Sequence, residues 1–198
     1  MTERKALLAI VGAGGHGMVV AETAELQGGW AHLQFFDDAL SHDQAVGAWS
    51  VAGKISHLLQ RLKSDPATLP IDVIVAIGHN ATRAATMEIL SQHGARFATV
   101  VHPRAYLSPS ATLGAGSVAL AGAVVNSRST LGEGCIVNVG AVVDHDVSVG
   151  AFAHLASGSV VAGGCDIGRM AWLGTGSRIA PGKRVEPNAV LLAGTVIV

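Results

Sequence analysis

The most regular feature of the chain is a six-residue spacing of apolar positions in its second half. From Val101 onward a branched aliphatic residue returns at every sixth position, and only Ala119 departs from the series. Its members are Val101, Leu107, Leu113, Val125, Leu131, Val137, Val143, Val149, Leu155, Val161, Ile167, Leu173, Ile179, Val185, Leu191 and Ile197. The fourth residue after each is nearly always Ala, Ser or Cys. No amphipathic helix keeps a strict period of six, so the pattern indicates repeated short strands.

A second period of eighteen residues lies on top of the first. Glycine recurs at 114, 132, 150 and 168, as expected if three hexapeptides complete one turn of a triangular solenoid with tight corners. The sequence therefore predicts an all-β domain at residues 101–198, a left-handed parallel β-helix of about five coils.

The first hundred residues carry a different pattern. Residues 6–11 read as an apolar strand, 12–17 as a glycine turn, 18–27 as a helix and 33–36 as a second strand. A near-continuous apolar run at 71–77 indicates a buried parallel strand, and 81–92 a further helix. Residues 64–70 read as an exposed loop. These elements predict an α/β, Rossmann-like domain at residues 1–100.

Composition and charge exclude several classes of function. A net charge of -1 offers no basic surplus for nucleic acid. No apolar run approaches the roughly 20 residues of a membrane helix, and the N-terminus lacks the pattern of a signal peptide. We therefore expect a cytoplasmic protein without a membrane span. Cys135 and Cys165 occupy small positions of the repeat, so we interpret them as core residues rather than as a disulfide or zinc ligands.

The glycine turn is a candidate phosphate-binding loop. Its sequence, Gly-Ala-Gly-Gly-His-Gly, satisfies G-x-G-x-x-G, and Asp37 follows about twenty residues later, as in dinucleotide-binding proteins. A dehydrogenase also needs a second nucleotide-binding half, and a solenoid follows here instead. Backbone N–H groups at a helix N-terminus attract any diphosphate, so a nucleotide-sugar is the favoured ligand. A purely structural turn stays open.

The segment Asp144-His145-Asp146 holds the sharpest chemical signal. A carboxylate bonded to one ring nitrogen leaves the other free to take a proton, which is the arrangement of a general base. Asp146 is the favoured partner, although the sequence does not decide between it and Asp144, and an ordinary surface histidine is the alternative. His154 follows nine residues later, half a coil away, so it could share a site with His145 only across a subunit interface.

Together these motifs resemble a known family, the hexapeptide-repeat sugar acyltransferases grouped with the sialic acid O-acetyltransferases. The likeness is greatest to bacterial UDP-4-amino-sugar N-acetyltransferases of the bacillosamine pathway. It covers almost the whole chain, through the glycine turn, Phe36-Asp37-Asp38, residues 76–80, His102-Pro103, Asn138, Asp144-His145-Asp146 and His154.

The resemblance implies a reaction and a set of site residues. The chain would transfer acetyl from acetyl-CoA to the amino group of a UDP-linked 4-amino-4,6-dideoxy sugar, as a homotrimer with active sites between subunits and with no metal. The implied catalytic residues are His145, Asp146 and Gly163, the last through its backbone N–H as oxyanion donor. Acetyl-CoA would contact His154, Thr175 and Ala193. The nucleotide-sugar would contact Gly14, Gly15, His16, Asp37, Asp38, Gly78 and Asn138.

Three alternatives stay open at this stage. O-acetylation of a sialic acid or another sugar hydroxyl would use the same base. A zinc hydratase of the γ-carbonic anhydrase type shares the solenoid, but Gly150 stands where its second histidine ligand is expected. A non-catalytic nucleotide-sugar-binding module is the third. The chain stops on a strand at Val198, whereas the family usually continues into a Gly/Pro-containing tail, so contacts to the far end of CoA are open.

Overall fold

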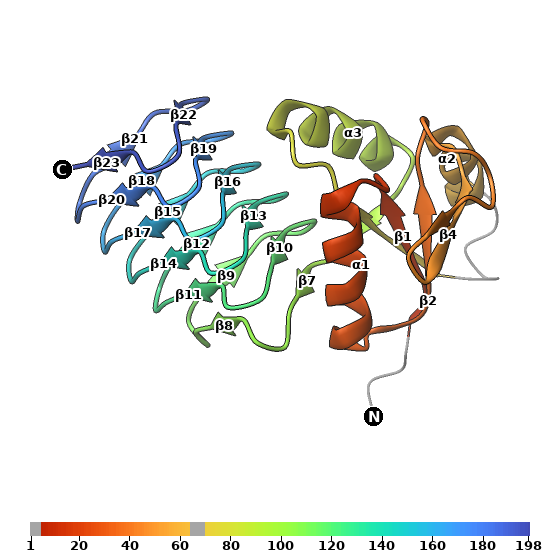
Figure 1. Ribbon diagram of the computed structural model, residues 1–198, viewed down its shortest axis with the longest axis horizontal. Coiled ribbons are helices and arrows are strands. Elements are labelled where there is room, and N and C mark those ends of the chain that lie inside the picture. The colour runs from red at the N-terminus through yellow and green to blue at the C-terminus, as the bar shows by residue number, and fades with distance from the viewer. Residues whose placement is uncertain (1–4, 64–69) are drawn as a thin grey trace. The chain divides into compact units, whose positions relative to one another are not determined.

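The computed structural model describes residues 5–63 and 70–198, which divide between two compact units, Met1–Val100 and Val101–Val198 (Figure 1). Residues 64–69, most of the loop predicted at 64–70, lie outside the described residues.

The first unit is built on a six-stranded sheet in the order β3-β4-β2-β1-β5-β6. Its strands are β1 (Lys5–Val11), β2 (Trp30–Phe36), β3 (Ala45–Val46), β4 (Trp49–Gly53), β5 (Ile71–Val75) and β6 (Arg96–Phe97). All neighbours pair in parallel except β3 and β4. The central position of β1 explains its apolar run, because a parallel strand covered on both faces has no solvent side.

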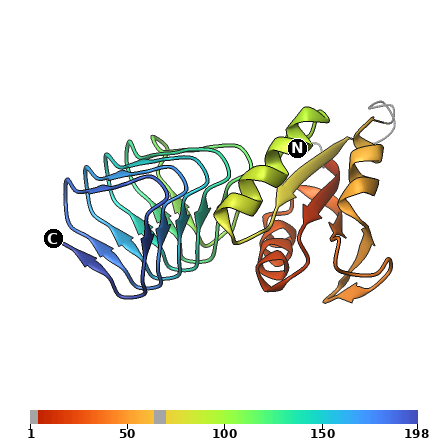
Figure 2. The ribbon, with the colours of Figure 1, turned by 90° about the horizontal axis from the view of Figure 1, so that it is seen from above.

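Three helices cover this sheet: α1 (Gly15–Gln27), α2 (Ile55–Lys63) and α3 (Asn80–Gln92). Figure 2 shows α1 on one side of the sheet and α2 and α3 on the other. None of the helices in the described ranges is long and apolar enough to cross a bilayer.

Two features of this unit differ from the sequence prediction. The glycine turn ends at Gly14, and α1 already begins at Gly15. A Cβ on Gly17 would lie 2.1 Å from the Gly12 carbonyl oxygen, so Gly17 allows the helix to pack closely on the turn. Strands β3 and β4 and helix α2 were not predicted, although Leu58 and its neighbours carry helical spacing.

The second unit is a parallel β-helix of three sheets, which confirms the fold predicted from the six-residue period. The first sheet contains β7 (Val100–Val101), β10 (Val118–Ala119), β13 (Ile136–Val137), β16 (His154–Leu155), β19 (Trp172–Leu173) and β22 (Val190–Leu191). The second contains β8 (Tyr106–Leu107), β11 (Val124–Val125), β14 (Val142–Val143), β17 (Val160–Val161), β20 (Arg178–Ile179) and β23 (Val196–Ile197). The third contains β9 (Thr112–Leu113), β12 (Thr130–Leu131), β15 (Ser148–Val149), β18 (Asp166–Ile167) and β21 (Arg184–Val185).

The six-residue series forms the core of the solenoid. The second residue of each strand packs inward with the small residues that follow four positions later. Cys135 and Cys165 are buried free cysteines, as predicted. Their thiols donate to the carbonyl oxygens of Gly150 and Ala180, at Sγ to O distances of 3.3 and 3.1 Å. The small residues therefore also link one coil to the next.

The corners of the solenoid share one backbone conformation. From residue 116 to residue 194, every sixth residue has a positive φ, the left-handed region that favours glycine. Nine of these fourteen corner residues are glycines, and the other five are Arg128, Asp146, Phe152, Met170 and Asn188.

Candidate active site

His145 lies in a corner turn of the solenoid. The turn follows β14, and Asp146 is its left-handed residue, with φ 58°. His145 Nδ1 lies 2.8 Å from Asp146 Oδ2. Because a carboxylate only accepts, Nδ1 carries the proton, and Nε2 is the nitrogen with a lone pair. The imidazole is 56% exposed, so a substrate can reach it.

The two carboxylates beside His145 have different partners. Asp144 Oδ1 accepts from the backbone N of His145 at 2.8 Å and from Asn126 Nδ2 at 3.2 Å. Asp144 therefore holds the backbone of the turn, while Asp146 contacts the ring. The sequence alone had left this choice open.

Arg128 stands one coil before Asp146 and binds its carboxylate through two atoms. Arg128 Nε lies 2.6 Å from Oδ1, and Nη2 lies 2.7 Å from Oδ2. The Arg128 guanidinium, followed by the bond from His145, holds the pKa of the Asp146 carboxyl well below its usual range. Asp146 is therefore an anion at every pH where the protein would work. Arg128 was missed from the sequence, although the eighteen-residue period places it next to Asp146.

Gly163 stands one coil after His145 and supports the ring. A Cβ on Gly163 would lie 2.7 Å from Cε1 and 2.8 Å from Nε2 of His145. Any larger residue would push the imidazole out of this position. The structure thus brings the residue predicted as oxyanion donor directly beside the predicted base.

A second cluster joins Asn138, His154 and Trp172. Asn138 Oδ1 accepts from the backbone N of Val139 at 2.8 Å, which fixes the orientation of the amide, and Nδ2 then faces His154 Nε2 at 3.2 Å. Nε2 is therefore an acceptor, and the neutral ring carries its proton on Nδ1. The Trp172 ring lies 4.2 Å from the imidazole, centre to centre, and His154 is only 5% exposed.

The two clusters lie on different parts of the solenoid. His154 is on β16 in the first sheet, whereas His145 follows β14 in the second. Thr175 and Ala193 are exposed and follow β19 and β22, strands of the same sheet as His154. The three residues predicted to contact acetyl-CoA therefore share one region of the solenoid, and His145 does not belong to it within one chain.

The predicted nucleotide-sugar residues of the first unit gather where β1, β2 and β5 end. Gly14 caps α1 at its N-terminus, and both Gly14 and Gly15 have open space where a Cβ would stand. Asp37 Oδ2 accepts from Ala13 N at 2.8 Å, which ties β2 to the glycine turn. Asp38 Oδ1 accepts from Ile55 N at 2.9 Å, at the start of α2. Both carboxylates already bind backbone, and both keep further lone pairs for a ligand.

A buried arginine holds the next turn at this edge of the sheet. The Arg83 guanidinium, 1% exposed, donates to the carbonyl oxygens of Ile77 and Gly78 and to Asn80 Oδ1, each at 2.9 Å. Burial, and secondly the charge of Arg83, lower the pKa of His16 to about 4. His16 is therefore neutral near pH 7, and the positive charge here comes from Arg83. The sequence analysis did not identify Arg83.

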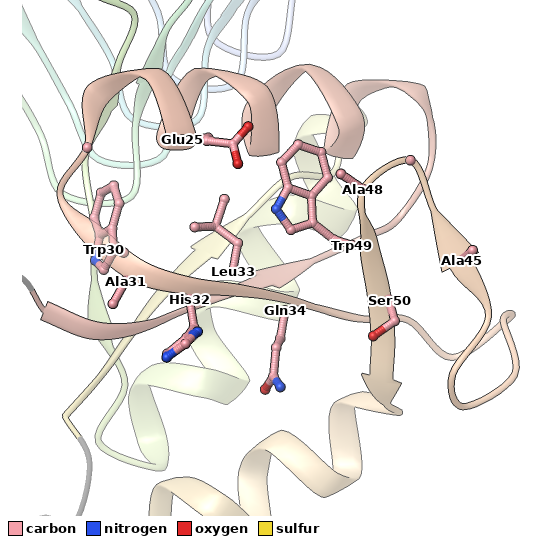
Figure 3. Close-up of a pocket in the computed structure, with 12 residues that line it drawn as sticks. Glu25, Trp30, Ala31, His32, Leu33, Gln34, Ala45, Ala48, Trp49 and Ser50 are labelled. Atoms are coloured by element: carbon pink, nitrogen blue, oxygen red, sulfur yellow. The ribbon is translucent and has the colours of Figure 1, made fainter.

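A separate cavity of about 740 Å³ lies along the N-terminal half of β2. Figure 3 shows Glu25 of α1 and the indoles of Trp30 and Trp49 around it. None of its lining residues is among those predicted to bind substrate.

Within residues 5–63 and 70–198 there is no group of three or more His, Cys, Asp or Glu placed to hold a metal ion.

Comparison with known proteins places these features in context. The model of the PglD N-terminal domain matches residues 7–90. The chain is 31% identical over 115 residues to the UDP-N-acetylbacillosamine N-acetyltransferase of Bacillus subtilis (strain 168), a match covering 58% of the chain and 51%, about half, of that curated relative.

Three solved structures resemble almost the whole chain. The acetyltransferase domain of PglB from Neisseria gonorrhoeae is 38% identical, with a TM-score of 0.91, over 98% of this chain and 92% of that one. A structure of that domain in complex with acetyl coenzyme A is 36% identical, with a TM-score of 0.89, over 98% and 93%. PerB from Caulobacter crescentus, in complex with CoA and GDP-perosamine, is 35% identical, with a TM-score of 0.86, over 96% and 88%.

Proposed function

The chain belongs to the PglD-type hexapeptide acetyltransferases, and from this membership we propose that it transfers the acetyl group of acetyl-CoA to the amino group of a UDP-linked 4-amino-4,6-dideoxy sugar, with His145 as general base. The observation that carries the proposal is the 2.8 Å contact between His145 Nδ1 and Asp146 Oδ2. It leaves Nε2 as the proton acceptor on an exposed corner.

The base acts on the attacking amine. As the sugar nitrogen bonds to the thioester carbonyl carbon, Nε2 of His145 takes a proton from that nitrogen. The imidazolium that forms is stabilised by Asp146, which is anionic because Arg128 keeps its pKa low. The protonated ring then has a proton to give to the leaving sulfur.

The remaining steps need an oxyanion donor and no enzyme nucleophile. The tetrahedral intermediate places negative charge on the former carbonyl oxygen, and the Gly163 N–H is the proposed donor to it. Collapse breaks the C–S bond, and the CoA thiolate takes the proton from His145. Cys135 and Cys165 are 0% and 1% exposed, so neither thiol is placed to form an acyl-enzyme.

The complete site is proposed to form between subunits of a homotrimer. His145 of one chain would face His154, Thr175 and Ala193 of its neighbour, with acetyl-CoA in the groove between the two solenoids. What supports this is that His145 and His154 belong to different parts of the same chain. The glycine turn, Asp37 and Gly78 would hold the nucleotide of the acceptor.

The test is thiol release from acetyl-CoA with amino-sugar nucleotides as acceptors. A UDP-linked 4-amino-4,6-dideoxy sugar and GDP-perosamine should be compared in the same assay. The Bacillus subtilis relative is named for a UDP-linked sugar, and PerB is solved with GDP-perosamine. His145→Ala is expected to lower kcat by about 100-fold or more, the usual scale of general-base catalysis.

His42 offers a matched control for this substitution. It also precedes a left-handed aspartate, Asp43, with φ 63°, and its Nδ1 also lies 2.8 Å from the carboxylate. His42→Ala is expected to keep wild-type turnover. Unchanged turnover in His145→Ala would contradict the assignment of the base, and acetylation of a sialic acid in place of every amino sugar would move the reaction to O-acetylation.

A further inference from the structure

The corner that carries His145 points to a residue beyond those implied by the family resemblance. We infer that Arg128 is a positioning residue, which holds the Asp146 carboxylate against His145 Nδ1 and so fixes the tautomer and the orientation of the proposed base. This inference rests on the proposed function for its catalytic meaning. Its physical content, the effect of Arg128 on the imidazole, can be measured without activity.

The three side chains form one connected array. Asp146 Oδ2 lies 2.7 Å from Arg128 Nη2 and 2.8 Å from His145 Nδ1, while Oδ1 lies 2.6 Å from Arg128 Nε. Guanidinium and imidazole therefore share one carboxylate oxygen. The planar, two-point contact fixes the carboxylate plane, and the carboxylate in turn fixes the ring over Gly163.

His42 and Asp43 show what the array adds to a histidine–aspartate pair. That pair has the same spacing, the same Nδ1 to Oδ2 distance of 2.8 Å and a left-handed aspartate. No guanidinium contact to Asp43 is present among the described residues. The local motif thus occurs twice in the chain, and the arginine distinguishes the copy at the proposed active site.

The backbone at these positions supports a role for the side chains. Arg128 and Asp146 both have φ 58°, a left-handed conformation that is strained for a non-glycine residue. Nine of the fourteen equivalent corners use glycine and avoid this strain. The same left-handed conformation occurs at Phe152, Met170 and Asn188, so backbone strain alone does not indicate a functional corner. What is specific is that Arg128 and Asp146 stand one coil apart and bind each other.

The contacts around the ring define the effect that we expect. Asp146 faces Nδ1, Asp144 binds the backbone N of His145, and Arg128 faces Asp146. Without Arg128 the Asp146 carboxylate can turn away from Nδ1. The ring proton can then move to Nε2, which leaves no lone pair on the nitrogen that acts as the proposed base.

Arg128→Gly tests this with little risk to folding, because glycine is the usual residue at these corners. We expect kcat to fall about ten-fold at neutral pH, with KM for both substrates unchanged, as for lost positioning of a catalytic group. Arg128→Lys, which keeps the charge without the two-point contact, should recover only part of the lost kcat.

Arg184→Gln is the matched control. Arg184 is 64% exposed and lies 3.7 and 3.4 Å from the carboxylates of Asp166 and Glu186, so its loss also removes a surface cation from a carboxylate pair of the solenoid. Its kcat and its His145 ring signal should equal those of the wild type.

Nitrogen-15 NMR of the His145 ring provides the readout independent of turnover. The wild type should show a single tautomer with the proton on Nδ1, and Arg128→Gly should show a mixture of the two tautomers. An unchanged ring signal in Arg128→Gly would overturn the inference, even if kcat fell. A wild type inactive on every amino-sugar nucleotide would defeat the proposed function instead, while the NMR comparison would still decide the role of Arg128.

Discussion

The imidazole of His145 packs against Gly163. Because glycine has no side chain, it leaves room for the ring of the proposed base. The contact joins two residues one coil apart. No apolar pattern reveals such a contact, because it depends on the absence of a side chain.

Gly163→Ala is therefore expected to impair turnover more than stability. The added Cβ would stand 2.7 Å from His145 Cε1, so the ring must move, and we expect kcat to fall about ten-fold or more, as for a misplaced catalytic group. The measurement is kcat together with the thermal unfolding midpoint. Gly29→Ala, at a site with open space around the Cβ, is the control, and a kcat within two-fold of that control would argue against the ring contact.

A second residue-scale prediction concerns acid stability. Burial and Arg83 lower the pKa of His16 from 6.5 to about 4, so as the pH falls the unfolded chain binds the proton first. Above pH 6.5 the His16 titration does not affect the free energy of unfolding. Between pH 6.5 and pH 4 it lowers that free energy progressively. From the linkage relation, the loss reaches about 3 kcal/mol.

Urea unfolding at pH 7 and pH 4 of the wild type and His16→Gln measures this effect. The variant lacks the titration, so its free energy of unfolding should fall less than that of the wild type. Equal losses in the two proteins would show that His16 stays protonatable in the folded state.

At the scale of elements, the glycines of the solenoid are required for two different structural reasons. Some glycines occupy left-handed corners, and others stand where one coil touches the next. Gly140 belongs to the first kind, with φ 65° and nothing within 4 Å of a Cβ. Gly132 belongs to the second, since a Cβ there would lie 2.6 Å from the backbone N of Ala151.

The same substitution should therefore have different consequences at these two glycines. Gly140→Ala adds only backbone strain and is expected to lower the free energy of unfolding by about 1 kcal/mol. Gly132→Ala forces two coils apart and is expected to cost about 3 kcal/mol or more, in the range of overpacked cores. Chemical denaturation of both variants provides the test, and equal losses would refute the distinction.

The elements also show where sequence reasoning succeeds. The six-residue series predicted the solenoid because each member of the series is an inward residue of a two-residue strand. The same reasoning missed β3 and β4, since a two-residue strand and a five-residue strand with mixed exposure leave no periodic signal. Helix α2 has the spacing of a helix, in Ile55, Leu58 and Leu62, and could have been predicted.

At the scale of the whole molecule, the proposed reaction depends on an interface between subunits. Each solenoid holds His145 in one region and His154, with Asn138 and Trp172, in another. If the site lies between subunits, each active site takes one cluster from each of two neighbours.

Mixing two inactive variants tests this arrangement. His145→Ala and His154→Ala subunits, unfolded together and refolded as random trimers, should regain about a quarter of wild-type activity, because a quarter of the interfaces combine two intact clusters. Each variant refolded alone is the control. Mixtures no more active than the separate variants would place both histidines in the site of a single chain or remove His154 from it.

The candidate site was only partly accessible from the sequence. His145 stood out because its acidic neighbours are adjacent in the chain, but the choice of Asp146 over Asp144 depends on which carboxylate reaches the ring across a left-handed turn. Arg83 was missed because its partners are set by side-chain conformation, which no spacing rule specifies. Arg128 could have been found, because it stands eighteen residues before Asp146. The roles predicted for Gly163, Thr175 and Ala193 stay predictions.

The glycine corners have a consequence for how such an enzyme could change. Stability resides in the inward residues, whereas most corners carry no side chain at all. A corner can therefore gain a charged or aromatic residue at a modest backbone cost while the core stays intact. New chemistry could be introduced one corner at a time, and a library that varies only the corner residues of this solenoid should retain a high proportion of folded members.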